Sequence, residues 1–76
     1  MLELYGTAWC AYTAELREEL EWRGERFVEY DVERDAAALT RMLGLCHGDR
    51  TVPVLAEGER VLQVGYNGRG CHASSP

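Results

Sequence analysis

The chain has 76 residues and a formal net charge of −5, so it is long enough for one small domain with a single core. This length excludes a two-domain enzyme and a repeat array. The acidic balance disfavours binding to nucleic acid or to anionic membranes, because both rely on cations that neutralise phosphates. The N-terminus shows no export signal and no apolar run approaches the ~20 residues that span a bilayer, so we expect a cytoplasmic protein.

The first part of the chain predicts a strand followed by a helix. Residues 2–5 alternate between apolar and polar side chains, which favours a short strand. Residues 11–23 are rich in Ala, Leu, Glu and Arg and contain neither Gly nor Pro, which favours a helix. Leu16 and Leu20 lie on one face of that helix, and Gly24 is a suitable residue to end it.

A second strand and a second helix follow. Residues 27–32 are mostly β-branched or aromatic, which predicts a strand. Residues 36–43 predict a helix, with Asp31 and Asp35 as alternative capping residues. Residues 44–50 form a predicted loop that contains a cysteine next to a histidine.

The second half of the chain predicts a β-hairpin. Residues 52–56 form the third strand and residues 60–64 the fourth, joined by a tight turn at residues 57–59. Pro53 lies near the start of the third strand, which suits a residue that cannot donate to a sheet ladder. A cis peptide bond before Pro53 would leave the carbonyl and amide of Val52 unpaired and open to an extended substrate.

These elements predict an α/β fold in the order βαβ-αββ, with one four-stranded mixed sheet, two helices and no C-terminal helix. The first two strands are expected to be parallel, because a helix joins them through a right-handed crossover. The last two strands are expected to be antiparallel, because they form a hairpin. We assign residues 1–68 to the domain and residues 69–76 to a tail that contains glycine, serine and Cys71 and is mobile at its end.

Three cysteines, at positions 10, 46 and 71, point to redox or metal chemistry. Their odd number and wide spacing argue against a secreted disulfide framework and favour a reducing compartment. Cys10 opens the first helix, where unpaired N–H groups and the helix dipole stabilise a thiolate. Thr13 lies one helical turn later, where its hydroxyl can donate to the Cys10 sulfur. The alternatives are a buried structural cysteine and an ordinary first-turn threonine.

Three segments of the chain together resemble the glutaredoxins: Cys10-Ala11-Tyr12-Thr13 after the first strand, Thr51-Val52-Pro53 before the hairpin, and Gly65-Tyr66 after it. The resemblance implies a thioredoxin-like fold with the sheet order 2-1-3-4. It also implies that Cys10 is the nucleophile, that a cis-Pro53 faces it, and that Val52 pairs with the main chain of the substrate's cysteinyl part. The implied substrate-binding residues are Trp9, Tyr12, Thr51, Val52, Pro53, Gly65 and Tyr66.

The chain departs from the usual glutaredoxin pattern at three places. Thr13 replaces the second cysteine of the Cys-Pro-Tyr-Cys motif, so a nearby resolving cysteine is absent. Thr7 stands where many glutaredoxins carry a lysine for glutathione, and residues 65–68 replace the segment that holds the other end of that tripeptide. The sequence is therefore compatible both with glutathione as a co-substrate and with a protein that does not bind glutathione.

Two narrower resemblances are visible. Trp9 together with Gly65-Tyr66 is similar to the redoxins that feed ribonucleotide reductase. Residues 65–71 resemble the tail of the bacterial UXX-star (seleno)proteins, in which the residue matching Cys10 is often selenocysteine.

Cys46 and Cys71 are two candidates for resolving a mixed disulfide on Cys10. Cys46 lies in the loop before Thr51, which adjoins the nucleophile in a glutaredoxin-like fold. Cys71 follows the fourth strand through a glycine-rich segment, which makes it the more mobile candidate. A bond between Cys46 and Cys71, and two unpaired thiols, are the alternatives, since only cysteines with Cα atoms within ~7 Å can bridge.

We therefore predict a thiol–disulfide oxidoreductase that reduces disulfides or mixed disulfides through Cys10 in a Cys-x-x-Thr motif, with Thr13 and Cys71 as further catalytic residues. Its partners would be a disulfide-containing protein or a glutathione mixed disulfide, and a thiol or flavoprotein reductant. We expect a monomer without a bound cofactor.

The alternative is a metal- or iron–sulfur-binding module on the same fold, because Cys10, Cys46-His47 and Cys71-His72 offer enough ligands. Adjacent Cys-His pairs do not match the spacing of a zinc ribbon.

Overall fold

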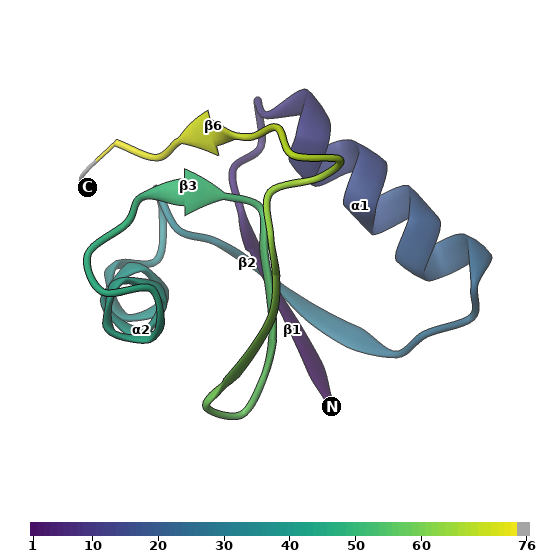
Figure 1. Cartoon of the computed structure of the whole chain (residues 1–76), viewed down its shortest axis with the longest axis horizontal. Helices are drawn as coiled ribbons and strands as arrows, with labels where there is room; N and C mark the ends of the chain where they lie inside the picture. The colour runs from purple at the N-terminus through teal and green to yellow at the C-terminus, as the bar shows by residue number, and fades with distance from the viewer. Residues whose placement is uncertain (75–76) are drawn as a thin grey trace.

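The computed structural model describes residues 1–74 and shows two helices packed against a four-stranded sheet (Figure 1). No helix in this described part is long and apolar enough to cross a membrane. In chain order the elements are β1 (Leu2–Gly6), α1 (Ala11–Trp22), β2 (Phe27–Asp31), α2 (Ala36–Leu45), β3 (Thr51–Val52), β4 (Val54–Glu57), β5 (Arg60–Val64) and β6 (Cys71–His72).

The main sheet has the strand order β2-β1-β4-β5. The β1–β2 pair is parallel, and the β1–β4 and β4–β5 pairs are antiparallel. This is the predicted order 2-1-3-4 when β4 and β5 are counted as the third and fourth strands. The predicted α/β architecture is therefore confirmed, including the parallel crossover through α1 and the final hairpin.

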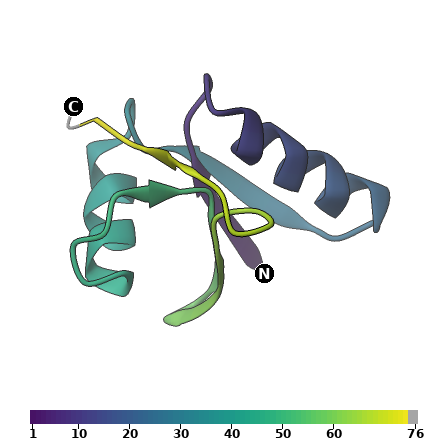
Figure 2. The same cartoon turned by 45° about the horizontal axis from the view of Figure 1, so that its top comes forward.

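The two helices lie on opposite faces of the sheet (Figures 1 and 2). Leu4 of β1 and Leu55 of β4 pack with Leu16 and Leu20 on the α1 side. Neighbouring strand residues point the other way, because successive side chains of a strand alternate between faces. They join the larger core cluster on the α2 side, which includes Tyr5, Val32, Ala38, Leu39, Met42, Val52, Val54, Ala56 and Ala73.

Local backbone chemistry sets the helix ends. At the end of α1, Gly24 has a φ of +71°, and its N–H donates to the Glu21 carbonyl while the Glu25 N–H donates to the Leu20 carbonyl. This glycine-terminated pattern is the one expected from the sequence. At the start of α2, Asp35 caps the helix by accepting a hydrogen bond from the Ala38 N–H.

The predicted third strand is interrupted at Pro53. Its first residue belongs to β3, and β4 begins only at Val54. Proline has no N–H to continue the ladder, so the chain changes partner there. The Val52–Pro53 peptide bond is cis, as the glutaredoxin resemblance implied.

The C-terminal part of the chain adds a strand that the sequence analysis did not predict. β6 pairs antiparallel with β3, so that Thr51 lies opposite His72 and Val52 opposite Cys71. The Ala73 N–H donates to the Arg50 carbonyl and extends the pairing by one residue. Figure 1 shows β6 beside β3 at the end of the sheet where α1 begins. The last two residues of the predicted tail, 75–76, lie outside the described residues.

Candidate active site

Cys10 occupies the junction between β1 and α1, as predicted. It is the N-cap residue of α1, and its carbonyl accepts a hydrogen bond from the Ala14 N–H. Its side chain makes no capping hydrogen bond and is only 2% exposed. The helix N-terminus leaves N–H groups without helical partners close to the sulfur, which favours the thiolate of a reduced Cys10.

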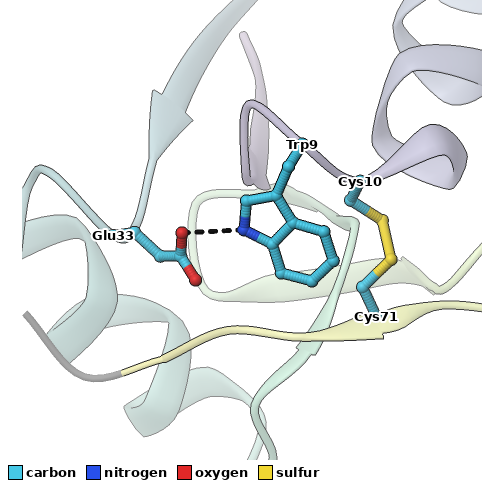
Figure 3. Close-up of a disulfide and its surroundings, with 4 residues drawn as sticks. All are labelled: Trp9, Cys10, Glu33 and Cys71. Atoms are coloured by element: carbon cyan, nitrogen blue, oxygen red, sulfur yellow. Dashed lines mark hydrogen bonds between the residues drawn. A yellow bond between two sulfur atoms is a disulfide. The ribbon is translucent and has the colours of Figure 1, made fainter.

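The Cys10 sulfur forms a disulfide with Cys71 (Figure 3). The two Cα atoms are 6.1 Å apart although 61 residues separate them in the sequence. Of the pairings that the sequence left open, the structure therefore contains Cys10–Cys71, and Cys46 is a free thiol. The tail strand β6 delivers Cys71 to the helix N-terminus.

The approach of the tail depends on a glycine. A Cβ atom on Gly70 would lie 2.6 Å from the Val52 carbonyl oxygen and 2.8 Å from Cγ2 of Thr51. Such contacts are too short for any side chain, so only glycine lets the backbone come this close to β3 without a shift. The residue directly before Cys71 thus sets how closely the tail approaches β3.

The main chain of Val52 is not open, contrary to the expectation from the sequence. It lies opposite Cys71 in the β3–β6 pair, so the chain's own tail occupies the edge where we expected an extended substrate. The reason is that β3 is a short, otherwise unpaired edge, and such an edge pairs readily with an extended segment. Thr51 belongs to the same β3–β6 pair, opposite His72. Pro53 and Gly65, two further predicted binding residues, contact each other, because the Pro53 carbonyl accepts a hydrogen bond from the Gly65 N–H.

Thr13 is fully buried beneath the end of β1. Its Oγ1 has no hydrogen-bond partner among residues 1–74, so it makes no hydrogen bond to Cys10 in this disulfide form. Donation to a Cys10 thiolate stays a prediction for the reduced protein. The Thr13 side chain packs against Gly6, where an added Cβ would lie 2.7 Å from Oγ1 and 3.0 Å from Cβ of Thr13.

We expect the Gly6→Ala substitution to lower the free energy of unfolding by about 2 kcal/mol, because the new methyl group overpacks a buried contact. Chemical denaturation of the oxidised protein measures this loss. Adding Thr13→Ala should restore at least half of it, because the collision is with the threonine side chain. If the two substitutions instead lower the free energy of unfolding additively, the collision between the new methyl group and the Thr13 side chain is contradicted.

Trp9 and the tail are joined by a residue that the sequence analysis missed. The indole Nε1 of Trp9 donates to Oε1 of Glu33 at 2.8 Å, and the Ser74 N–H donates to Oε2 of the same carboxylate at 2.9 Å. These two hydrogen bonds, the one from Ser74 first, hold the pKa of the Glu33 carboxyl below its usual value. Glu33 carries no motif, and its partners are 24 and 41 residues away, so no local signal could have found it.

The remaining predicted binding residues lie on the α1 side of the site. Tyr12 and Tyr66 line one surface hollow of about 340 Å³, together with Glu15, Asn67 and Arg69. The Tyr66 hydroxyl donates to the Glu19 carboxylate at 2.9 Å, and this hydrogen bond is the main reason that the Tyr66 pKa is raised. Tyr66 is thus anchored to α1 rather than directed at the disulfide.

Cys46 ends α2 and is half-buried. Burial, followed by the nearby Asp49 carboxylate, raises the pKa of this thiol, which disfavours its thiolate. Residues 1–74 bring no three His, Cys, Asp or Glu side chains into a group that could hold a metal ion. The proposed ligand pairs Cys46-His47 and Cys71-His72 therefore do not form a metal site with Cys10 in this disulfide form.

A buried cysteine at the N-terminus of α1 and a cis-proline between β3 and β4 are features of a redox protein of the thioredoxin-like fold. A family model described as Glutaredoxin matches residues 2–61, and the chain belongs to the glutaredoxin family. Membership of this family indicates thiol–disulfide redox chemistry. The narrower UXX-star resemblance stays a prediction, because the matched residues end before the tail that carries it.

The solved structures to which the chain is similar include the thioredoxin-like protein BC3987 and a point variant of it. Each is 26% identical to this chain, with a TM-score of 0.72. The match covers 82% of this chain in both cases, and 84% and 82% of the wild-type and variant chains. None of the curated proteins matches this chain.

Proposed function

We propose that the protein is a thiol–disulfide oxidoreductase in which Cys10 is the nucleophile and Cys71 the resolving thiol. The single observation that carries this proposal is the Cys10–Cys71 disulfide at the N-terminus of α1. It supports a dithiol mechanism in a family whose usual second cysteine is replaced here by Thr13. Family membership supports the reaction class.

The proposed reaction balances over two exchanges. The Cys10 thiolate attacks a substrate disulfide, forms a mixed disulfide and releases one substrate thiolate. The Cys71 thiolate then attacks the Cys10 sulfur, which forms the internal disulfide and releases the second substrate thiolate. The substrate gains two electrons and the protein loses two. Because both electrons come from the two sulfurs, the reaction needs no bound cofactor.

The substrate and the tail would use the same edge of β3 in turn. In the disulfide form β6 pairs with Thr51 and Val52. An extended cysteine-containing chain that pairs with Val52 must therefore wait until the tail has moved away. Substrates of this kind are proteins with accessible disulfides or glutathione mixed disulfides. An external thiol or a flavoprotein reductase would then reopen the Cys10–Cys71 bond.

Mild oxidation tests the two assignments together. The reduced protein is treated with one equivalent of oxidised glutathione, and intact mass and peptide mapping follow. We expect the loss of two hydrogens and a mapped link between Cys10 and Cys71. The Cys71→Ser variant should instead retain one glutathione on Cys10, because no internal thiol displaces it.

Cys46→Ser is the matched control, since it removes the remaining cysteine and should leave the product unchanged. Glutathione found mainly on Cys46, or a link that includes Cys46, would contradict the assignment. So would a reduced wild-type protein that does not react.

A further inference from the structure

Glu33 lies in the loop between β2 and α2, outside every motif of the family resemblance. Its backbone N–H donates to the Asp31 carboxylate at 3.0 Å, and Asp35 caps α2 two residues later. The loop is thus held at both sides by short-range hydrogen bonds. This places the Glu33 carboxylate on the far side of the Trp9 indole from the disulfide (Figure 3).

The two oxygens of Glu33 have different partners on the two sides of the disulfide. Oε1 accepts from the Trp9 indole, and Trp9 directly precedes Cys10. Oε2 accepts from the Ser74 N–H, three residues after Cys71. Figure 3 shows the indole lying between the Glu33 carboxylate and the disulfide. The carboxylate therefore links the nucleophile's side of the site to the tail without a covalent bond.

The tail has few other contacts that would survive reduction of the disulfide. The short β3–β6 pair, the hydrogen bond from the Ala73 N–H to the Arg50 carbonyl and the burial of Ala73 hold it in place. At its start, the Tyr66 and Arg69 backbones hydrogen-bond to each other. His72 and Ser74 point to solvent, as the alternation of a strand requires. The hydrogen bond from the Ser74 N–H to the Glu33 carboxylate therefore adds a charged acceptor at the end of this short strand.

We propose that Glu33 is a positioning residue that holds the tail next to Trp9 and thereby presents Cys71 to Cys10. The proposal rests on the proposed function, in which Cys71 resolves the mixed disulfide on Cys10. Holding the tail in place raises the effective concentration of the Cys71 thiol at the nucleophile. It therefore favours the internal disulfide over both the open dithiol and a mixed disulfide with an external thiol.

The test is the redox equilibrium of the Glu33→Gln variant. The amide keeps the size of the side chain, but an NH2 donor replaces one of the two oxygens, so either the Trp9 indole or the Ser74 N–H would face a donor instead of an acceptor. Both proteins carry Cys46→Ser and are equilibrated in buffers of reduced and oxidised glutathione. Acid quenching and intact mass then give the three species. We expect the equilibrium constant for the internal disulfide to fall by about 3- to 10-fold, with more Cys10–glutathione adduct.

Two further variants separate positioning from general effects. Glu59→Gln removes an exposed carboxylate in the β4–β5 turn and should leave the equilibrium unchanged. Trp9→Phe removes the indole donor, and its effect should be less than additive with Glu33→Gln, because both remove the same hydrogen bond.

An equilibrium constant in Glu33→Gln equal to that of the parent protein would overturn the proposal. Fully additive effects of the two substitutions would do the same. If the parent protein forms no internal disulfide at all, the proposed function fails instead, so the two failures are distinguishable.

Discussion

Replacing Cys10 by serine will reduce disulfide reductase activity to the background of the uncatalysed exchange, a loss on the order of 10³-fold or more. Cys10 is the cysteine at the N-terminus of α1, where a thiolate is stabilised. A serine hydroxyl stays protonated at neutral pH and does not exchange with disulfides. Reduction of a protein disulfide, coupled to a thiol reductant, measures the effect.

Cys71→Ser should block a different step of the reaction from the one that Cys10→Ser blocks. Its first exchange remains intact, so a glutathione adduct forms at the normal rate. Release of the substrate then depends on external thiol, so turnover at low thiol concentration should fall by about tenfold and recover as thiol is added. Activity retained by Cys10→Ser, or lost equally in both variants at every thiol concentration, would contradict the assigned roles.

Reduction of the Cys10–Cys71 bond will lower the free energy of unfolding by about 3–4 kcal/mol. The disulfide closes a loop that spans a sequence separation of 61 residues, and a cross-link of this size removes much chain entropy from the unfolded state. For a domain of this size, that loss corresponds to a fall in Tm of about 12–30 °C. Urea denaturation with and without a reductant measures it.

The sign of the difference in free energy of unfolding between the disulfide and dithiol forms also indicates the direction of the redox reaction. A protein that reduces its substrates is itself oxidised in the reaction. We therefore expect folding to stabilise the disulfide form more than the dithiol form. If the reduced form proved the more stable, the Cys10–Cys71 pair would be an oxidant of other thiols. The Cys71→Ser variant should match the stability of the reduced protein, and Cys46→Ser should retain the full difference.

The predicted elements of the main sheet and the two helices follow from local patterns. Alternation in residues 2–5 predicts β1, and the β-branched and aromatic run predicts β2. The last turn of α1 follows from Gly24, which accepts a φ of +71° without a side-chain penalty. Asp35 marks the start of α2 because its carboxylate accepts a backbone N–H that no helical carbonyl can reach.

The tail shows how a local signal can be present and still be missed. Asn67 and Gly68 both have positive φ, and the Tyr66 and Arg69 backbones hydrogen-bond across them in both directions. Asn-Gly is the preferred pair for such a two-residue turn. The dipeptide could therefore have predicted that the chain reverses after β5. It could not have predicted where the returning strand would pair.

By itself, the sequence predicted the order of helices and strands and the position of Cys10 at a helix N-terminus, because each depends on neighbours within a few residues. The sheet order and the cis-Pro53 were expected from the resemblance to the glutaredoxins and not from local patterns. Only the tertiary structure decided that Cys71, and not Cys46, reaches Cys10. It also decided that the tail covers Val52 and that Glu33 joins Trp9 to Ser74. These contacts join residues 19 to 61 positions apart, and they arise only once the sheet has placed β3 beside the start of α1.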